Sequence, residues 1–360
     1  MNYIVLDLEW NQSPIGQAGE HPRMPFEIIE IGAIKLNEKF EILSEFRRLI
    51  CPKLYTKFHK YIKDMLNYTE KDLKAEGVGF KVACGEFLDW CSQEGDDYEF
   101  CTWGGSDLSY LQNNMDFYHM DKLSYPLKYY DIQQIYADRY SKDGNICKLE
   151  KAIDYLRINN DRPFHAAIND AYYTARVMQV AKLGKINDKY TFDLYRHPKK
   201  HEDAIVAFHN GIIDQISEEY PSRNDAMADS EISTILCPKC GRKTSRRVKW
   251  FQLPSGTELS VGKCFLHGNI MATIKLKPAS DSSDSVFVVK KVVPISKTKF
   301  KEIKDKKDIY DEKKRERDRR YKERLNSRES STTAERLRKN QTKRKNGNGK
   351  SQVANSTAES

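Results

Sequence analysis

The sequence predicts an α/β protein, with a mixed sheet flanked by helices in its first half, a small β-rich module after it and a charged tail. Three observations support this prediction. Apolar, β-branched runs alternate with amphipathic runs up to about residue 185. Residues 231–296 combine short β-rich runs with a paired Cys/His pattern, and beyond Lys297 apolar residues become sparse. The 360 residues provide room for two or three domains of about 100–200 residues each.

The elements of the first domain, residues 1–185, follow from composition and periodicity. Strands are expected where β-branched and aromatic residues gather, and helices where apolar residues recur at helical spacing. The expected strands are 3–10, 26–36, 41–50 and 98–103, and the expected helices are 61–66, 82–91, 108–115, 149–156 and 170–183. The break at 37–40 predicts a hairpin turn between the second and third strands. We place the domain boundary near Lys185.

The second half of the chain divides by composition into three parts. Residues 186–230 are expected to form a helical connector and linker, because 204–216 form an amphipathic patch and 218–230 are polar. Residues 231–296 form the β-rich module, with strands expected at 270–276 and 286–293. Residues 297–360 cannot bury a core, so we expect a solvated helix followed by disorder.

The charge of the chain is concentrated in this tail. Residues 297–360 contain 22 Lys/Arg and 11 Asp/Glu, a net +11, whereas the whole chain carries +9, which leaves −2 for residues 1–296. Such asymmetry favours a polyanion partner, with RNA or ribosome tethering as the specific possibility and a solvated extension as the alternative. The sequence has no signal-peptide pattern and no apolar run long enough to span a membrane. The cysteine usage indicates a reducing cytoplasm rather than a disulfide framework.

An acidic pair lies in the first predicted strand, where Asp7 and Glu9 interrupt an apolar run. Residues i and i+2 of a strand point to one face about 6.6 Å apart, so both carboxylates can converge on one cation while Leu6 and Leu8 face the core. A solvent-facing acidic rim has the same spacing. Charge in an apolar strand is costly unless it is compensated, which favours the cation site.

Two further positions add acidic groups. Asp107 follows a Gly-Gly loop at the start of a predicted helix, where capping that helix is the alternative role. His165 is expected on a loop and Asp170 in the first turn of the next helix, where interaction with the helix dipole is the alternative for Asp170. Each position lies where an α/β sheet presents residues to a common cleft. Their joint occurrence therefore predicts one shared site.

The segments IVLDLEW, EIIEIGAIKL, CTWGGSDLSYL and FHAAINDAYYTARV resemble the exonuclease motifs of the DEDDh subgroup of the DnaQ-like, or RNase T, superfamily. Within it, the sequence is most similar to the Eri-type and KapD-like branch. The resemblance covers about residues 1–183 and implies a ribonuclease H-like fold and metal-dependent 3′-to-5′ exonuclease activity. The Eri-type likeness implies single-stranded RNA 3′ ends as the substrate. All five motif positions, Asp7, Glu9, Asp107, His165 and Asp170, match.

The resemblance also implies roles for these residues. Two Mg²⁺ or Mn²⁺ ions about 3.5–4 Å apart would be held by the four carboxylates. Asp7 would bridge both ions, Glu9 and Asp170 would complete the nucleophile side, and Asp107 would hold the other ion. His165 is the candidate general base, and the product would be a nucleoside 5′-monophosphate.

Trp10, directly after the acidic pair, is a candidate for stacking on the terminal base of the substrate. Core packing is the commoner fate of such a tryptophan. Two other functions remain open: a non-catalytic nucleic-acid-binding adaptor, which loss of a carboxylate would indicate, and a DNA-directed proofreading or repair exonuclease, because no residue identifies the group that would meet a 2′-OH.

A second metal pattern lies in the β-rich module. Three cysteines and a histidine with the spacing C-x2-C-x23-C-x2-H, namely Cys237, Cys240, Cys264 and His267, match a closed tetrahedral zinc site with a structural role. Unrelated buried cysteines are the alternative. The pattern looks like a zinc ribbon. A basic stretch with interleaved aromatics follows the first pair and predicts substrate contact: Arg242, Lys243, Arg246, Arg247, Lys249, Trp250 and Phe251.

Overall fold

The computed structural model describes residues 1–93, 97–141, 145–181, 186–280 and 284–348, with the backbone alone for 325–348. Contacts divide the chain into two compact units. Unit 1 comprises 1–233 together with 276–291, and unit 2 comprises 234–275 together with the residues from 292 onward. The predicted boundary at Lys185 lies outside the described residues.

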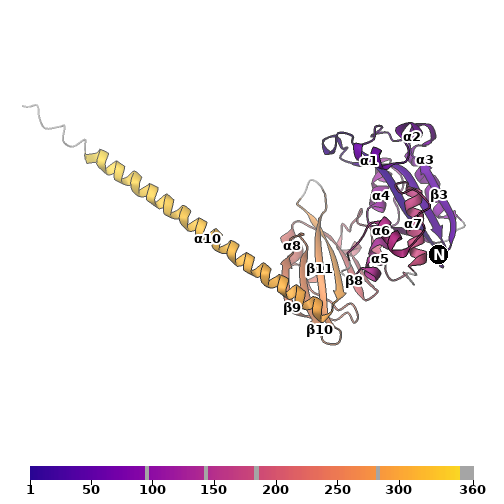
Figure 1. Ribbon diagram of the computed structural model, residues 1–360. Helices are drawn as coiled ribbons and strands as arrows, with labels where there is room; N and C mark the ends of the chain where they lie inside the picture. Colours follow the sequence, from indigo (N-terminus) through magenta and orange to yellow (C-terminus); the bar gives the residue numbers. More distant parts are fainter. Residues whose placement is uncertain (94–96, 142–144, 182–185, 281–283, 349–360) are drawn as a thin grey trace, which may run out of the picture. The chain divides into compact units, whose positions relative to one another are not determined.

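A six-stranded mixed sheet forms the centre of unit 1 (Figure 1). Its strands are β1 (Asn2–Gln12), β2 (Phe26–Leu36), β3 (Ile42–Leu49), β4 (Tyr98–Thr102), β5 (Lys128–Asp131) and β6 (Thr191–Phe192), in the order β3-β2-β1-β4-β5-β6. β1, β4 and β5 run parallel, and the other neighbours pair antiparallel. Phe40, with φ 63°, closes the predicted hairpin between β2 and β3.

Helices cover both faces of this sheet. They are α1 (Lys60–Met65), α2 (Glu70–Glu76), α3 (Phe80–Cys91), α4 (Asp107–Phe117), α5 (Ile132–Tyr140), α6 (Leu149–Leu156) and α7 (Ala167–Val180), with a 3-10 turn η1 (Gln17–Gly19). α5, α6 and α7 pack on the face that carries Tyr3 and Val5. α3 and α4 pack on the opposite face, against Ile4, Leu6 and Leu8. Successive side chains of β1 therefore enter two different hydrophobic cores, as expected of a strand that is covered on both faces.

The expectation of a helical connector at 204–216 is wrong. These residues form a β-hairpin of β7 (Ile205–His209) and β8 (Ile212–Tyr220), paired antiparallel. Its two-residue turn is Asn210-Gly211, with φ 45° and 68°, and an Asn-Gly pair that adopts positive φ at both positions is a strong hairpin signal. A 3-10 turn, η3 (His201–Asp203), precedes the hairpin. Two short helices, α8 (Arg223–Ala228) and α9 (Ser230–Ser233), follow it.

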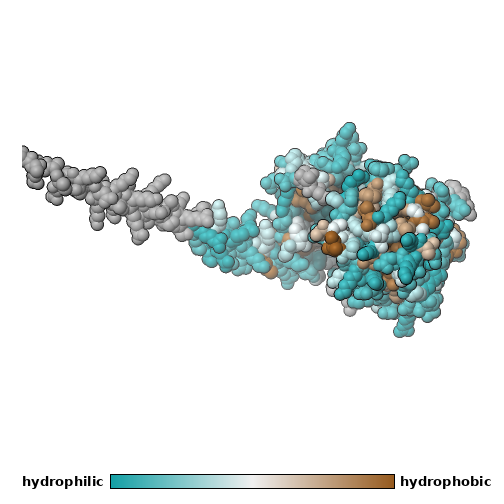
Figure 2. All heavy atoms as spheres, turned by 90° about the horizontal axis from the view of Figure 1, so that it is seen from above, coloured by the Kyte–Doolittle hydropathy of each residue, from teal (hydrophilic) through white to brown (hydrophobic). Residues whose placement is uncertain are grey.

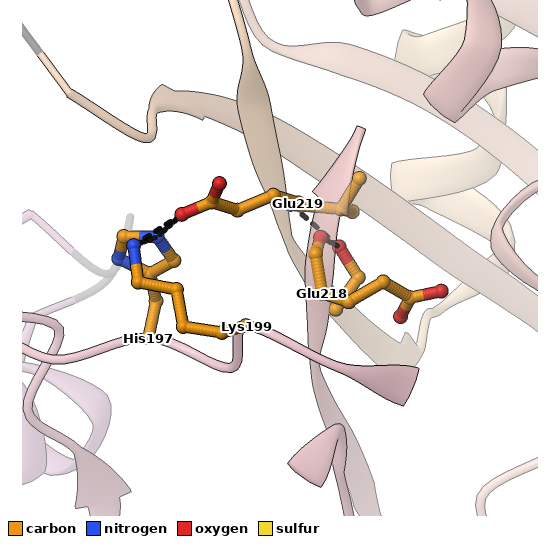
Figure 3. A network of polar contacts seen from close by, with 6 residues as sticks. His197, Lys199, Glu218 and Glu219 are labelled. Carbon is orange, nitrogen blue, oxygen red and sulfur yellow. Dashed lines mark hydrogen bonds and ion pairs between the residues drawn. The ribbon is translucent and has the colours of Figure 1, made fainter. Parts of the chain in front are cut away.

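Ion pairs attach the segment before this hairpin to β8. The His197 ring and the Lys199 ammonium both contact the Glu219 carboxylate, the histidine at 2.8 Å between Nε2 and Oε1 (Figure 3). Lys199, followed by His197, lowers the pKa of Glu219. The His197 ring also stacks on Phe287, with ring centroids 4.1 Å apart. The segment is therefore held to the hairpin by ion pairs with Glu219 and to Phe287, outside the hairpin, by aromatic packing.

Unit 2 contains an antiparallel sheet of β9 (Ser245–Gln252), β10 (Glu258–Cys264) and β11 (Gly268–Pro278). β12 (Val286–Pro294) begins in unit 1 and ends in unit 2, and the long helix α10 (Lys297–Asn348) of unit 2 follows. Ile303 of α10 is buried against Val248 and Leu259, so the start of the helix belongs to the core of the unit. Beyond this point the described side chains of α10 are mostly hydrophilic and exposed (Figure 2).

Most predicted elements are confirmed within a few residues. The strand at 26–36 and the helix at 149–156 have the predicted bounds. The strands expected at 270–276 and 286–293 are present. The tail is helical as far as residue 348, and its last twelve residues lie outside the described part. Among the described residues, no helix is both long and apolar enough to cross a membrane.

Candidate active site

Asp7 and Glu9 lie on β1, the inner strand between β2 and β4. Both side chains are partly buried, while Leu6 and Leu8, on either side of Asp7, are buried in the core formed with α3 and α4. The register of β1 with β2 shifts just after Glu9. Such a bulge bends the strand and re-aims side chains, which is common next to active sites.

Asp170 reaches the same place from α7, because the start of this helix lies close to β2. Gly32 is the register partner of Asp7, and a Cβ at Gly32 would lie 2.0 Å from the backbone nitrogen of Ile168. Only a glycine permits this approach of helix to strand. The backbone of His165, with φ 63°, also helps to position Asp170, because the His165 backbone N–H donates to Asp170 Oδ2 at 3.2 Å.

Asp107 begins α4 at the end of the loop that follows β4. Its side chain is buried, and its Oδ1 accepts a hydrogen bond of 3.2 Å from the backbone N–H of Leu8, the residue between the acidic pair. The carboxylate is therefore tied to β1. The N-cap position of α4 is Ser106, whose side chain makes no capping hydrogen bond, and Asp107 is the first residue of the helix.

Burial and neighbouring negative charges raise the pKa values of all four acids. Burial, followed by the charges of Asp107, Asp170 and Glu9, raises the pKa of Asp7 well above its ordinary value. Burial is also the largest cause for the other three, raising the pKa of Glu9 to about 8 and those of Asp107 and Asp170 to about 7. Buried carboxylates that lie close together repel one another when they are ionised, and a bound cation would relieve this repulsion.

The donor set fits divalent cations. Carboxylate oxygens of Asp7, Glu9 and Asp170 lie within 4.8 Å of one another. Asp170 Oδ1 is buried and has no hydrogen-bond partner among the described residues, as expected of an oxygen aimed at an ion. Oxygen-only ligands suit Mg²⁺ and Mn²⁺. Three of the four predicted acids thus share one centre, and the fourth is bonded to the strand that carries two of them.

Glu30 is a fifth carboxylate at this centre that the sequence analysis did not single out. It is fully buried on β2, directly opposite Glu9 in register, and Arg47 Nε donates to its Oε1 at 2.8 Å. Tyr68 lies beside it: burial, then the charges of Glu30 and Glu9, raises the pKa of the Tyr68 hydroxyl. A charged residue in the apolar run EIIEIGAIKL was the signal available in the sequence.

Trp10 lies in a half-buried aromatic cluster. Its ring centroid is 4.7 Å from that of Tyr110 and 6.3 Å from that of Phe26, and its side chain packs against the core beneath β1. Trp10 therefore packs against the core and is also partly exposed next to Glu9, as both core packing and base stacking require.

The Cys/His pattern converges in unit 2. Cys240 Sγ and Cys264 Sγ are 3.8 Å apart, and His267 Nδ1 is 3.4 Å from Cys237 Sγ and 3.6 Å from Cys264 Sγ. A tetrahedron with Zn–S of about 2.3 Å and Zn–N of about 2.05 Å has edges of about 3.8 Å between sulfurs and about 3.6 Å between sulfur and nitrogen. The spacing of the four groups therefore matches a tetrahedral zinc site.

The predicted basic and aromatic stretch of this unit is only partly exposed. Arg242, Lys243, Arg246, Arg247 and Lys249 are exposed, whereas Phe251 is buried in the core against Tyr310, and Trp250 is partly buried. Phe265, which lies between the candidate zinc ligands Cys264 and His267, is far more exposed than either aromatic of this stretch. Sequence alone did not separate the two faces of β9.

A mixed sheet covered by helices on both faces, with acidic residues gathered from β1, α4 and α7, defines a ribonuclease H-like nuclease domain. Residues 4–178, just under half of the chain, match the family model RNase_T, which is described as Exonuclease. No curated protein matches the chain significantly.

Several solved structures are similar to the first half of the chain. A 3′-exonuclease that recognises a histone mRNA stem-loop is 20% identical over 51% of this chain and 63% of its own, with a TM-score of 0.44. The nuclease domain of 3′hExo, a DEDDh family member bound to rAMP, is 21% identical over 51% and 91%, with a TM-score of 0.44. Pop2p of S. pombe, with Mg²⁺ and Mn²⁺, is 18% identical over 51% and 84%, with a TM-score of 0.39. The match of residues 4–178 to an exonuclease domain rests on the family model and not on these likenesses.

Substitution of Gly32 by alanine is expected to reduce exonuclease turnover by about a hundredfold, because the new Cβ must push the start of α7, and with it Asp170, away from Asp7. Initial rates on a labelled oligonucleotide test this. Gly85→Ala is the matched control, since a Cβ at Gly85 on α3 meets nothing within 4 Å. Wild-type turnover in Gly32→Ala would contradict the positioning role.

The metal-free protein should lose stability as pH rises. The folded-state pKa values of Glu9, about 8, and of Asp107 and Asp170, about 7, exceed their ordinary values of 4.5 and 3.8, so the folded chain binds more protons than the unfolded chain between these limits. The Tm measured without divalent ions is therefore expected to fall between about pH 5.5 and about pH 8, and added Mn²⁺ should raise it more at the higher pH. A Tm gain from Mn²⁺ that is larger at the lower pH would contradict this.

Proposed function

We propose that this protein is a 3′-to-5′ exonuclease that removes nucleotides from the 3′ end of single-stranded nucleic acid, with RNA as the preferred substrate. The observation that supports it most is the convergence of the Asp7, Glu9 and Asp170 carboxylates, with Asp107 bonded to the same strand, inside a domain of the exonuclease family. The preference for RNA rests on the resemblance to the Eri-type branch alone.

In the proposed reaction, Asp7, Glu9, Asp107 and Asp170 hold two Mg²⁺ or Mn²⁺ ions. Such ions, when bound, supply a more acidic water and neutralise charge on the attacking and leaving oxygens. Water attacks the terminal phosphorus, the bond to the 3′ oxygen breaks, and a nucleoside 5′-monophosphate leaves. His165 takes the proton of the attacking water, and its partial exposure lets it return that proton to solvent. The departing 3′ oxygen takes a proton from solvent, so the shortened nucleic acid ends in a new 3′-hydroxyl.

The chain's own residues prepare this step. The Asp107 carboxylate is oriented by the Leu8 N–H, and the Asp170 carboxylate by the His165 N–H, so neither has to be ordered when substrate arrives. The strained backbone of His165, at φ 63°, keeps this loop turned toward Asp170. Trp10 is proposed to stack on the terminal base through its exposed part.

We further propose that Cys237, Cys240, Cys264 and His267 hold one structural zinc ion, and that the protein works in the reducing cytoplasm. The fit of the four ligand atoms to a tetrahedron supports the zinc site. None of the eight cysteines forms a disulfide, which agrees with a reducing compartment.

Matched single-stranded RNA and DNA, each with a free or a blocked 3′ end and a 5′ label, test the proposal. We expect stepwise shortening of the free 3′ ends, faster on RNA, no shortening of blocked ends, and nucleoside 5′-monophosphates as products. Faster digestion of DNA would favour a proofreading or repair enzyme. Binding without digestion of either polymer in Mg²⁺ or Mn²⁺ would favour the non-catalytic adaptor.

A further inference from the structure

Unit 2 contains a groove outside the exonuclease domain, with a volume of about 870 Å³. The end of β9 and the loop that follows it, residues 251–256, form one wall. The other wall is α10, which contributes Lys306, Ile309, Tyr310, Lys313, Lys314 and Arg317. This volume lies within the range of about 300–1,000 Å³ that ligand-binding pockets occupy.

The two walls are held in place by the core of unit 2. Phe251 at the base of the groove is buried against Tyr310, with ring centroids 5.6 Å apart, and Lys307 lies over both rings at 5.7 and 5.4 Å. The loop closes as a turn in which the Leu253 N–H donates to the Thr257 carbonyl at 2.8 Å and Gly256 has φ 82°. The groove is therefore a built feature rather than a gap beside a loose helix.

Every charged residue that lines the groove is a cation. Lys306, Lys313, Lys314 and Arg317 line it, and no carboxylate is among the described lining residues. α10 does carry carboxylates in this stretch, such as Asp305, Asp308 and Glu312. Their absence from the lining means that the helix turns its positive side to the groove. With a rise of 1.5 Å per residue, the row from Lys306 to Arg317 is about 17 Å long.

The groove also presents apolar and aromatic surface between these cations. The side chain of Ile309 is 54% exposed, Pro254 is exposed, and Tyr310 is half-buried. A smaller hollow farther along α10 shares Lys313 and Arg317 with the groove and is lined as well by Glu316, Arg320, Tyr321 and Arg324, where Glu316 pairs with Arg320. Cations interleaved with accessible tyrosine rings are what single-stranded nucleic acids bind, through phosphates and stacked bases.

We propose that this groove binds the body of a single-stranded nucleic acid, with phosphates on the four cations and bases against Ile309 and Tyr310. The inference rests on the proposed function, since it gives the exonuclease a second contact with its substrate. An acidic peptide would satisfy the cations but would leave the apolar and aromatic surface without a matching partner. The chemistry of the groove therefore favours a nucleic acid.

Two variants of the full chain with equal charge change test the groove. The first carries Lys306→Gln, Lys313→Gln, Lys314→Gln and Arg317→Gln. The control carries Lys299→Gln, Lys301→Gln, Lys304→Gln and Lys322→Gln, which lie on α10 outside the groove lining. The probe is a fluorescein-labelled single-stranded RNA of about 20 nucleotides with a blocked 3′ end, followed by anisotropy over a series of salt concentrations.

The groove variant is expected to bind at least about tenfold more weakly, with a slope of log Kd against log salt reduced by about 3, because each lost phosphate contact contributes about 0.7 on a single strand. The control should bind within about threefold of wild type. Equal weakening in both variants would overturn the proposal, as would tight binding of a polyglutamate peptide that the groove substitutions abolish while RNA binding persists.

Digestion of a free trinucleotide separates this inference from the proposed function. Three nucleotides are too short to need a second contact, so the groove variant should digest the trinucleotide at the wild-type rate while its KM for the long RNA rises about tenfold. If the wild-type protein does not digest the trinucleotide, the proposed exonuclease activity is contradicted. Unchanged KM for the long RNA would contradict the groove alone.

Discussion

Substitution of Asp7 by asparagine is expected to lower exonuclease turnover by at least about a thousandfold. Asp7 lies at the centre of the carboxylate group, with the charges of Asp107, Asp170 and Glu9 all acting on it. Metal-based stabilisation of the reacting phosphate is worth several kcal/mol, and each 1.36 kcal/mol is a factor of ten in rate. Release of nucleoside 5′-monophosphate from a single-stranded oligonucleotide measures the effect.

The same variant should be more stable than wild type when divalent ions are absent. Asparagine removes the buried charge that the neighbouring carboxylates repel, so the metal-free Tm should rise by several degrees while the gain from added Mn²⁺ disappears. Asp64→Asn, at an exposed position on α1, is the matched control and should leave both quantities at wild-type values. A variant at Asp7 with full turnover would refute the assignment of the site.

Loss of zinc from unit 2 should unfold that unit. Substitution of Cys264 by serine removes one of four ligands, and structural zinc contributes an apparent binding free energy of about 10–16 kcal/mol that is also folding free energy. We expect bound zinc to fall from one ion per chain to none, and residues 234–275 to become accessible to protease. Elemental analysis and limited proteolysis followed by mass spectrometry measure the two outcomes.

Cys147→Ser is the control for this experiment, because Cys147 is a half-buried thiol of unit 1 with no candidate ligand group among its described contacts. It should retain zinc and protease resistance. Digestion of a trinucleotide should persist in Cys264→Ser, since the carboxylates of the active site all come from unit 1. Retention of zinc and of a protected unit 2 after loss of Cys264 would rule out the tetrahedral site.

The sequence predicted the first unit well because its local signals agree with its fold. β2 is rich in β-branched and other apolar residues, a local signal for a strand, and α6 carries a clear helical period. The segment 204–216 failed for the opposite reason. Its apolar residues fit a helical spacing, yet the Asn210-Gly211 turn, which demands positive φ at both positions, outweighs that period.

The candidate site was predictable to the extent that spacing along one element determines geometry. The i, i+2 spacing of Asp7 and Glu9 placed both on one face of β1. Glu30 and Gly32 could not be assigned in this way, because their importance depends on which residues of β1 and α7 lie opposite them. Cross-strand register and helix-to-sheet distance are tertiary facts, and a single strand sequence does not contain them.

Counting the Mn²⁺ ions that the zinc-loaded protein binds tests the central claim most directly, namely that Asp7, Glu9, Asp107 and Asp170 gather around shared cations. Calorimetric titration or the Mn²⁺ resonance signal gives this number. We expect two ions per chain in wild type and a loss of at least one in Asp7→Asn, with Asp64→Asn unchanged. Wild-type protein that binds no Mn²⁺, or that binds the same number of ions after Asp7 is replaced, would contradict the account.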